Sequence, residues 1–381
     1  MTKTADDDKV IRLRSARDVA AALPRLLGYR PRDSIVFLNT HADHRVSTMR
    51  VDLPAPAPES IEKRYVTSLV GMLCKVPDVD RVVIVVYAPG PFDAGGDVPR
   101  ARLVRTLIAR LLGSGFAVHD AVCVAEDAWG AYDGHDAGIP RRLEDLDEAP
   151  LGAEDCALPA GDVEELAALP PVGHLARRAF DAALDRALQG AELFRPIDAA
   201  EAALALDPDT ADSDELAAIM PVLLYPELRD AVLFTWAWDG ERGLELLDEA
   251  ERIDAGEIGP GDDTIALDLM GLGHAEPPDR GRIGRAIALM SRIAALAPDD
   301  LAHVPLTVLA WLHWSQGRGS IAGRLVDRAR ELDAGYGLAE LLQAVVRRGH
   351  LPAWAFTMPD EPDEPGEPGA RNEPGAPGCA D

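Results

Sequence analysis

The sequence predicts two unlike folded regions, a mixed α/β sheet domain at residues 10–130 and an all-α repeat domain at residues 172–357. Three observations support this fold class. In the first region β-rich runs alternate with amphipathic segments, as in a sheet layered with helices. The second region is helical in its periodicity. It also repeats one phrase almost unchanged, as "LLDEAERIDAG" at residues 246–256 and "LVDRARELDAG" at residues 325–335.

In the first region, Ser15 suits a helix N-cap and Gly28 a helix stop, with Pro24 expected to kink or split the helix between them. The β-rich runs at residues 33–39 and 45–53 predict a hairpin. The elements expected next are a helix, a buried strand, a second helix capped by Asp97 and a returning strand, at residues 59–75, 81–88, 98–113 and 116–126. Together they predict a mixed sheet.

Three segments lack the pattern of a folded core. Residues 131–171 are acidic and rich in Gly and Pro, which indicates a long loop or linker between the domains. Residues 1–9 are expected to be a disordered amino terminus. Residues 358–381 form an acidic Pro/Gly tail, and we expect it to be disordered because it has too little apolar surface to bury.

The repeated phrase has a third relative at residues 285–300, which matches the last copy at an offset of 36 residues. Helix–turn–helix repeats of about 34 to 45 residues give such spacings, and each helical pair has an apolar face that only a neighbouring pair can cover. We therefore expect the phrase to be the second helix of a repeated hairpin. Its apolar residues would face inward, and its acids and arginines would face water.

Residues 310–339 resemble a tetratricopeptide repeat. Trp314 takes the large aromatic position and Gly317 the turn, while Ala322 and Ala329 take the small positions where helices approach closely. Ala334 stands where the usual proline would be. The resemblance implies a concave surface that holds a protein or peptide partner. Tryptophans of this region are candidates for that contact, although aromatics at repeat positions are usually core: Trp236, Trp311 and Trp314.

The chain carries 38 basic and 65 acidic residues, a net charge of −27. A surface this negative repels phosphate backbones and anionic lipids, so we expect no nucleic-acid partner and no membrane binding. The longest apolar run, "VVIVVYA" at residues 82–88, is too short to span a bilayer. The four cysteines are far apart in the sequence, which favours free thiols and a cytoplasmic protein.

The usual motifs for cofactors and catalysis are missing from the sequence. The loop at residues 89–97 lacks a phosphate-binding lysine motif, and "GLGHAE" at residues 271–276 lacks the third glycine of a dinucleotide fingerprint. No G-x-S-x-G or H-E-x-x-H occurs. We expect no cofactor and no metal. Asp133, His135 and Asp136 are the weak metal candidates, and an exposed acidic loop is the favoured interpretation.

Several stretches together resemble an actinobacterial family known only as a domain of unknown function, number 4192: "LPRLLGYRPRDSIVFL", "RVDLP", "LRDAVLFTWA" and "PLTVLAWLHWSQGRGSIAGRLVDRARELDAG". The resemblance brings no activity, substrate or cofactor with it. Many members of the family carry a tryptophan/tyrosine motif followed by a short cysteine cluster in the middle of the chain, so the resemblance leads us to look for both here. Here Trp129 and Tyr132 match the aromatic pair, but "DGHDAGIP" follows without cysteine.

Polar residues within these motifs are the catalytic candidates if the α/β region has a site: Asp33, Ser34, Arg50 and Asp52. Alternatively, Asp33 and Ser34 cap a strand, and Arg50 and Asp52 lie on its exposed face. The favoured function is a protein-interaction or adaptor module that acts through the helical repeats. The alternative is an enzyme or small-ligand receptor with its site on the α/β domain. A structural or phage-borne assembly component is a weaker alternative.

Overall fold

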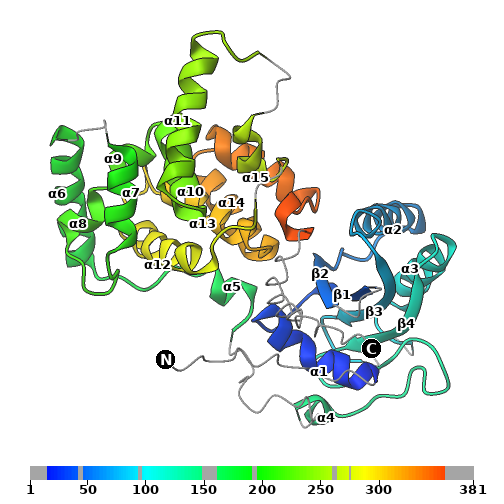
Figure 1. Cartoon of the computed structure of the whole chain (residues 1–381). Helices are drawn as coiled ribbons and strands as arrows, with labels where there is room; N and C mark the ends of the chain where they lie inside the picture. Colours follow the sequence, from blue (N-terminus) through cyan, green and yellow to red (C-terminus); the bar gives the residue numbers. More distant parts are fainter. Residues whose placement is uncertain are drawn as a thin grey trace, which may run out of the picture.

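The computed structural model describes residues 15–41, 46–92, 97–147, 161–190, 195–259, 264–273 and 276–356. They form a sheet-containing amino-terminal half and a helical carboxyl-terminal half (Figure 1). This architecture confirms the predicted fold class. Within the described residues, no helix is both long and apolar enough to cross a membrane. The predicted terminal tails, residues 1–9 and 358–381, lie outside the described residues.

The amino-terminal half is built on a five-stranded sheet in the order β2-β1-β3-β4-β5. β1 is antiparallel to both of its neighbours, β3 and β4 are parallel, and β5 is antiparallel to β4. The sequence does not predict β5, which is three residues long with a central glycine. The strand bounds are Ser34–His41 for β1, Val46–Asp52 for β2, Val79–Tyr87 for β3, Ala117–Val124 for β4 and Trp129–Ala131 for β5.

Helices cover both faces of this sheet. α1 (Ala16–Leu27) packs on the face that carries Val36, Leu38 and Val85. α2 (Glu59–Leu73) and α3 (Ala101–Gly113) pack on the face that carries Ile35, Phe37 and Ile84. The short α4 (Glu144–Asp147) contacts α1. Alternate residues of β1 therefore belong to two separate cores, as the period of two in a strand requires.

The helix caps agree in part with the sequence. The Ser15 hydroxyl accepts the N–H of Asp18, and Gly28 ends α1 in the left-handed conformation at φ 77°. Pro24 does not split α1, because it lies in the last turn of one continuous helix. The prediction of Asp97 as the cap of α3 is wrong. The Asp97 carboxylate accepts the N–H of Val98, and the helix begins only after Arg100.

The carboxyl-terminal half is helical throughout its described residues. Its largest core joins residues from α6 to α15 and includes Trp236, Trp311 and Trp314. The elements are α5 (Val163–Leu166), α6 (His174–Gly190), α7 (Pro196–Leu204), α8 (Ser213–Ala217), α9 (Met220–Leu223), α10 (Pro226–Ala237), α11 (Gly240–Asp254), η1 (Ile265–Met270), α12 (Arg280–Leu296), α13 (His303–Ser315), α14 (Gly319–Leu332), α15 (Gly337–Arg347) and η2 (Ala353–Phe356).

The repeated phrase occupies the second helix of two helical pairs, α10 with α11 and α13 with α14. In α14 and in its relative α12, the matched positions are fully buried: Ala322, Val326 and Ala329, and Ala286, Met290 and Ile293. In α11, the expectation that the acids face water is wrong for Glu249. Its buried carboxylate accepts the N–H groups of Ile265 and Ala266 at 2.8 and 3.0 Å and so holds the start of η1.

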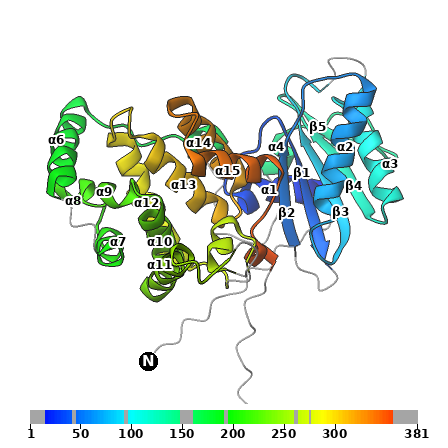
Figure 2. The same ribbon diagram turned by 90° about the horizontal axis from the view of Figure 1, so that it is seen from above.

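The two halves contact each other along the β2 edge of the sheet, which lies beside α15 in Figure 2. Tyr29, directly after α1, is buried in the core of the helical half. The Arg50 guanidinium of β2 donates a hydrogen bond to Ser320 of α14 at 3.2 Å. The end of α2 also lies against the helical half, because a side chain added at Gly349 would collide with the sulfur of Met72. Polar residues of β2 therefore lie at the junction.

Candidate functional site

The strand register places a set of side chains in one row at the edge of the sheet where β2, β3 and β4 end. Asp52 pairs with Ser34, Ser34 with Tyr87, Tyr87 with Val124, and Val124 with Trp129. Directly paired residues have their side chains on the same face. Tyr87 and Trp129 pack in the core beneath α1, so the row lies on that face. The carboxyl edge of an open α/β sheet is where such folds usually bind ligands.

Hydrogen-bond donors in this row are buried but have no partner among the described residues. They are Ser34 Oγ, Tyr87 OH and Trp129 Nε1. Arg50 Nε is also buried without a partner among the described residues, and Arg50 lies two residues before Asp52 on the same face of β2. We call Ser34, Arg50 and Tyr87 the donor cluster, because they lie on the same face of the three neighbouring strands β1, β2 and β3. An unsatisfied buried donor costs about 1–3 kcal/mol, so folded proteins retain few of them. Their concentration here marks the row as a candidate site.

Arg50 has more contacts than the other members of the donor cluster. One guanidinium nitrogen lies 2.5 Å from the Asp52 carboxylate, and the other donates to the Arg32 carbonyl at 3.3 Å. The Arg50 side chain is only 9% exposed, whereas that of Asp52 is 70% exposed. Water therefore screens the Asp52 charge more effectively than the Arg50 charge. The cluster presents a buried cation, and its one carboxylate partner among the described residues, Asp52, is mostly exposed to solvent.

The tyrosines around the cluster are neutral donors at ordinary pH. Burial raises the pKa of the Tyr87 phenol well above its usual value of 10, and the nearby Tyr29 adds to the shift. Burial also raises the pKa of Tyr29, although the Arg50 charge and a hydrogen bond with Ser320 oppose the change. Neither phenol is therefore a base at neutral pH. The cluster offers N–H and O–H donors, and its natural complement is an acceptor with negatively charged oxygen.

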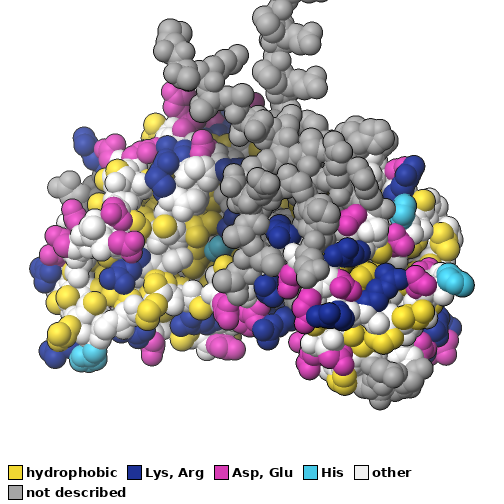
Figure 3. Space-filling view, turned by 90° about the horizontal axis from the view of Figure 1, so that it is seen from below, with side chains coloured by type: hydrophobic (Ala, Val, Ile, Leu, Met, Phe, Trp, Pro, Cys, Tyr) yellow, Lys and Arg dark blue, Asp and Glu magenta, His cyan; other side chains and the backbone are white. Residues whose placement is uncertain are grey.

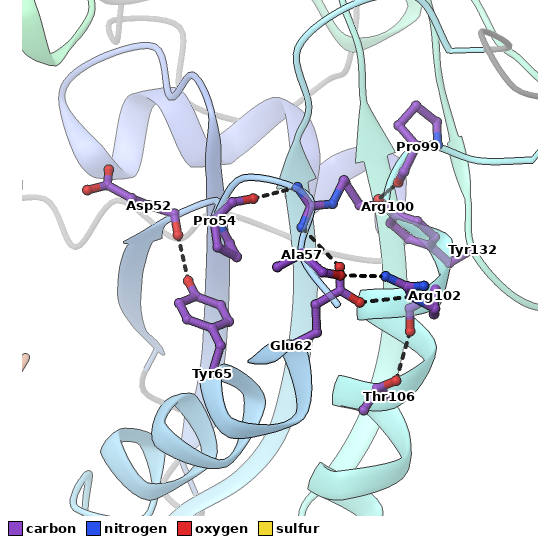
Figure 4. Close-up of polar contacts among 10 residues, drawn as sticks. All are labelled: Asp52, Pro54, Ala57, Glu62, Tyr65, Pro99, Arg100, Arg102, Thr106 and Tyr132. Atoms are coloured by element: carbon purple, nitrogen blue, oxygen red, sulfur yellow. Dashed lines mark hydrogen bonds and ion pairs between the residues drawn. The ribbon is translucent and has the colours of Figure 1, made fainter. Parts of the chain in front are cut away.

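A second polar group supports the same sheet edge from the opposite face (Figure 4). The buried Glu62 carboxylate of α2 accepts the Nε–H of Arg102 at 2.9 Å and lies 3.7 Å from Arg100. The hydrogen bond from Arg102 lowers the pKa of Glu62. Arg100 also donates to the Pro54 carbonyl at 2.5 Å. These contacts tie the segment after β2 to the start of α3, although Arg100 Nη2 makes no hydrogen bond among the described residues.

The second group also holds the end of β2 in place. The Tyr65 hydroxyl of α2 donates to the Asp52 carbonyl at 2.5 Å, while the Asp52 carboxylate contacts Arg50 on the other face. The Tyr132 hydroxyl donates to the Pro99 carbonyl at 2.6 Å and fixes the opposite end of the same edge. The positions of Arg50 and Asp52 are therefore determined from both faces of the sheet.

A family model described as a domain of unknown function, DUF4192, matches residues 17–258 and 268–353. The chain belongs to the DUF4192 family. The match includes the whole donor cluster and both sides of the junction between the halves. No curated protein and no solved structure matches the chain.

In this DUF4192 chain, three of the four candidates from the sequence lie together. Ser34, Arg50 and Asp52 share one face of the hairpin formed by β1 and β2. Asp33 does not join them, because its side chain is exposed and its backbone carbonyl accepts the N–H of Leu53. The alternative that Arg50 lies on an exposed strand face does not hold for its buried side chain.

The structure brings in three residues that sequence reasoning missed: Tyr29, Tyr87 and Ser320. It also adds Trp129, which the sequence matched to the family's aromatic pair but not to this site. Tyr87 and Trp129 belong to strands whose neighbours depend on the chain crossover, which the sequence does not specify. Tyr29 follows directly after the helix stop at Gly28 within the motif "GYRPRDS". This large aromatic residue directly after a helix end was the sequence signal that could have pointed to Tyr29.

The metal and partner candidates are placed elsewhere. Asp133, His135 and Asp136 are exposed, Asp136 is paired with Arg141 at 2.6 Å, and no metal-binding group of three or more ligands occurs in the described part of the chain. Trp236, Trp311 and Trp314 lie in the core of the helical half, so no groove lip presents their rings.

The buried thiol of this DUF4192 chain is not a nucleophile at neutral pH. Burial raises the pKa of Cys123 to about 12, and the nearby Tyr132 hydroxyl lowers it only in part. The reactive form of a cysteine is the thiolate, which is scarce at neutral pH when the pKa is this high. Cys74 is exposed, and Cys156 and Cys379 lie outside the described residues.

Proposed function

We propose that this protein binds a small ligand through a negatively charged oxygen group, and that the donor cluster at the junction of the two halves is the binding site. The observation that carries the proposal is a set of buried donors that have no partner among the described residues, Ser34 Oγ, Arg50 Nε and Tyr87 OH, on adjoining strands. A ligand oxygen would accept their hydrogen bonds and remove the cost of leaving them unmade.

The chemistry of the cluster favours an anion over a neutral ligand. Arginine only donates, and the raised pKa of Tyr87 keeps its phenol protonated. Hydrogen bonds from these groups to a charged oxygen are about twice as strong as bonds between neutral partners. Binding is better supported than catalysis, because neither Tyr29 nor Tyr87 is deprotonated at neutral pH.

The test is ligand-induced stabilisation of the full chain. Acetate and inorganic phosphate are titrated at constant ionic strength and pH 7.5 while the unfolding temperature is measured. We expect a saturable rise, because a ligand bound only to the folded state stabilises it by mass action. The double variant Ser34→Ala, Tyr87→Phe should lose that rise. The matched control changes the same residue types at exposed positions, Ser68→Ala with Tyr225→Phe, and should keep it.

Failure would show clearly in this design. If neither anion produces a saturable shift, or if the cluster variant and the control respond alike, the donor cluster is not an anion site. A uniform effect on all three proteins would instead reflect the general stabilisation that phosphate gives by exclusion from protein surfaces.

The adaptor role stays a second proposal, with a protein or peptide as its partner and the helical half as its surface. Its support is the repeated helical pair and the hydrophobic side chains that gather on one face of the helical half in Figure 3. Leu175 of α6 is 81% exposed and is therefore available to a partner. If a pull-down with the full chain recovers the same proteins as its Leu175→Glu variant, this surface is not the docking site. The tetratricopeptide-like character and the cytoplasmic location remain predictions.

A further inference from the structure

The helical half contributes its own anion-attracting feature to the junction. α14 has 14 residues, and its cap residue, Arg318, makes no side-chain hydrogen bond to the first turn. The first N–H groups of a helix have no acceptor within the helix, and they carry about half a positive charge together. Helix N-termini of this kind are common phosphate sites. Ser320, the second residue of α14, lies in this first turn.

An independent observation connects this helix start with the donor cluster. Arg50 donates from Nη1 to the Ser320 hydroxyl at 3.2 Å, so its guanidinium points into the first turn of α14. The side chain is more than nine-tenths buried, and its Nε has no partner among the described residues. Tyr29 shares a hydrogen bond with Ser320 and lies close to Tyr87. A buried cation and the positive end of a helix thus face each other across one hydroxyl group.

We infer that the N-terminus of α14 and the donor cluster form one phosphate-binding site that spans the two halves. This inference rests on the proposed function and specifies its ligand class, a small molecule with a phosphate group. A phosphate dianion has enough oxygens to accept from a guanidinium, helix N–H groups and hydroxyls at once, whereas a carboxylate has two oxygens and one charge. The ligand would also link the halves, because its contacts come from both.

The Asp52 carboxylate would compete with such a ligand for the Arg50 guanidinium. Its carboxylate lies 2.5 Å from the Arg50 guanidinium that the phosphate would contact, and no other carboxylate is paired with Arg50 in the described structure. Since the Asp52 side chain is 70% exposed, its repulsion of an anion is weakened by water. Asp52→Asn should therefore tighten phosphate binding by about two- to fivefold, the range that an exposed ion pair of up to about 1 kcal/mol allows.

The experiment is calorimetric titration of the full chain with inorganic phosphate and with acetate, at pH 7.5 and constant ionic strength. We expect phosphate to bind at least tenfold more tightly than acetate. Ser320→Asp places a carboxylate at the helix start beside Arg50, where it should occupy the site and weaken phosphate binding at least tenfold. Ser68→Asp is the control, since it adds the same charge on the exposed surface of α2, which covers the other face of the sheet.

The outcomes separate this inference from the proposed function. If acetate binds as tightly as phosphate, or Ser320→Asp binds phosphate like the unchanged chain, the two-sided phosphate site is wrong while an anion site on the sheet stands. If neither anion binds the unchanged chain, both proposals fail. Should Ser320→Asp not fold, Asp52→Asn decides the question, because an unchanged or weaker affinity for phosphate overturns the inference.

Discussion

The buried tryptophans of the two halves differ in whether their indole N–H groups make a hydrogen bond. In the helical half, each buried indole donates to a backbone carbonyl: Trp236 to Ala200, Trp311 to Leu269, Trp314 to His350 and Trp354 to Ser315, at 2.6 to 3.0 Å. In the sheet half, Trp129 is equally buried, but its N–H has no partner among the described residues. The N–H groups of these tryptophans in the helical half therefore form hydrogen bonds that stabilise the fold.

The difference distinguishes a structural core from a candidate site. Helices α7, α10 and α13 are joined to distant segments by these indole hydrogen bonds, so the polar groups there stabilise the fold. The sheet row has buried donors for which the described part of the chain supplies no acceptor. Residues kept for function are often suboptimal for stability.

Trp236→Ala should produce the largest loss, about 3–5 kcal/mol in the free energy of unfolding, because it opens a cavity in the core and leaves the Ala200 carbonyl without its donor. Trp238→Ala is the matched control, since Trp238 is only half-buried and donates to the exposed Glu276 carbonyl. Urea denaturation of the full chain measures both. Equal losses at the two positions would contradict the structural role assigned to Trp236.

His313 is one of three exceptions among the described residues of the helical half, together with Arg292 and His350, because its Nδ1 is buried and has no hydrogen-bond partner there. Burial lowers its pKa from 6.5 to about 4, with a smaller contribution from Arg318. The unfolded chain therefore binds a proton first as pH falls, so this group destabilises the fold progressively from pH 6.5 down to about 4. The full effect is about 3 kcal/mol at the lower end of that window.

The measurement is the free energy of unfolding at pH 7 and pH 5 for the unchanged chain and for His313→Leu. We expect the variant to lose less stability between the two pH values, because its side chain cannot take up a proton. His174→Leu, at an exposed position at the start of α6, is the control and should behave like the unchanged chain. The same pH dependence in all three proteins would contradict a depressed pKa at His313.

Paired substitutions compare the two kinds of tryptophan directly. Trp311→Phe removes the donor to the Leu269 carbonyl, whereas Trp129→Phe removes a donor that has no acceptor within the described structure. Both lose similar buried surface, so Trp311→Phe should cost about 1–2 kcal/mol more, the price of one orphaned carbonyl. Urea denaturation midpoints at equal slope give the difference. A larger loss at Trp129 would mean that its N–H already has a partner.

The sequence predicted those parts of the site that depend on local structure. Ser34, Arg50 and Asp52 lie on adjoining strands of one hairpin, and the alternation along each strand already places Arg50 and Asp52 on the same face. The helix caps at Ser15 and Gly28 are equally local. The fold class followed from periodicity, which needs no tertiary information.

What the sequence did not predict depends on contacts between distant segments. β1 lies between β2 and β3, and its pairing with β3 brings Tyr87 beside Ser34. Ser320 meets Arg50 only because the helical half packs on the β2 edge. The helical pattern predicts that Glu249 faces solvent. In the structure, η1 covers this side chain, and the Glu249 carboxylate accepts the first N–H groups of η1. Helical periodicity alone gives no sign of such a covering segment.

The smallest expected effect gives the sharpest test of the contrast, because it concerns a change of sign. Tyr87→Phe and Ser34→Ala each delete a buried hydroxyl that has no partner among the described residues. Without ligand, each should leave the free energy of unfolding unchanged or raise it by up to about 1 kcal/mol, since a buried unsatisfied group is removed at little loss of packing. Tyr132→Phe is the control, because its buried hydroxyl donates to the Pro99 carbonyl and its loss should destabilise the fold by about 1 kcal/mol or more. If Tyr87→Phe destabilises the protein as much as Tyr132→Phe does, the Tyr87 hydroxyl already serves the fold and is not held ready for a ligand.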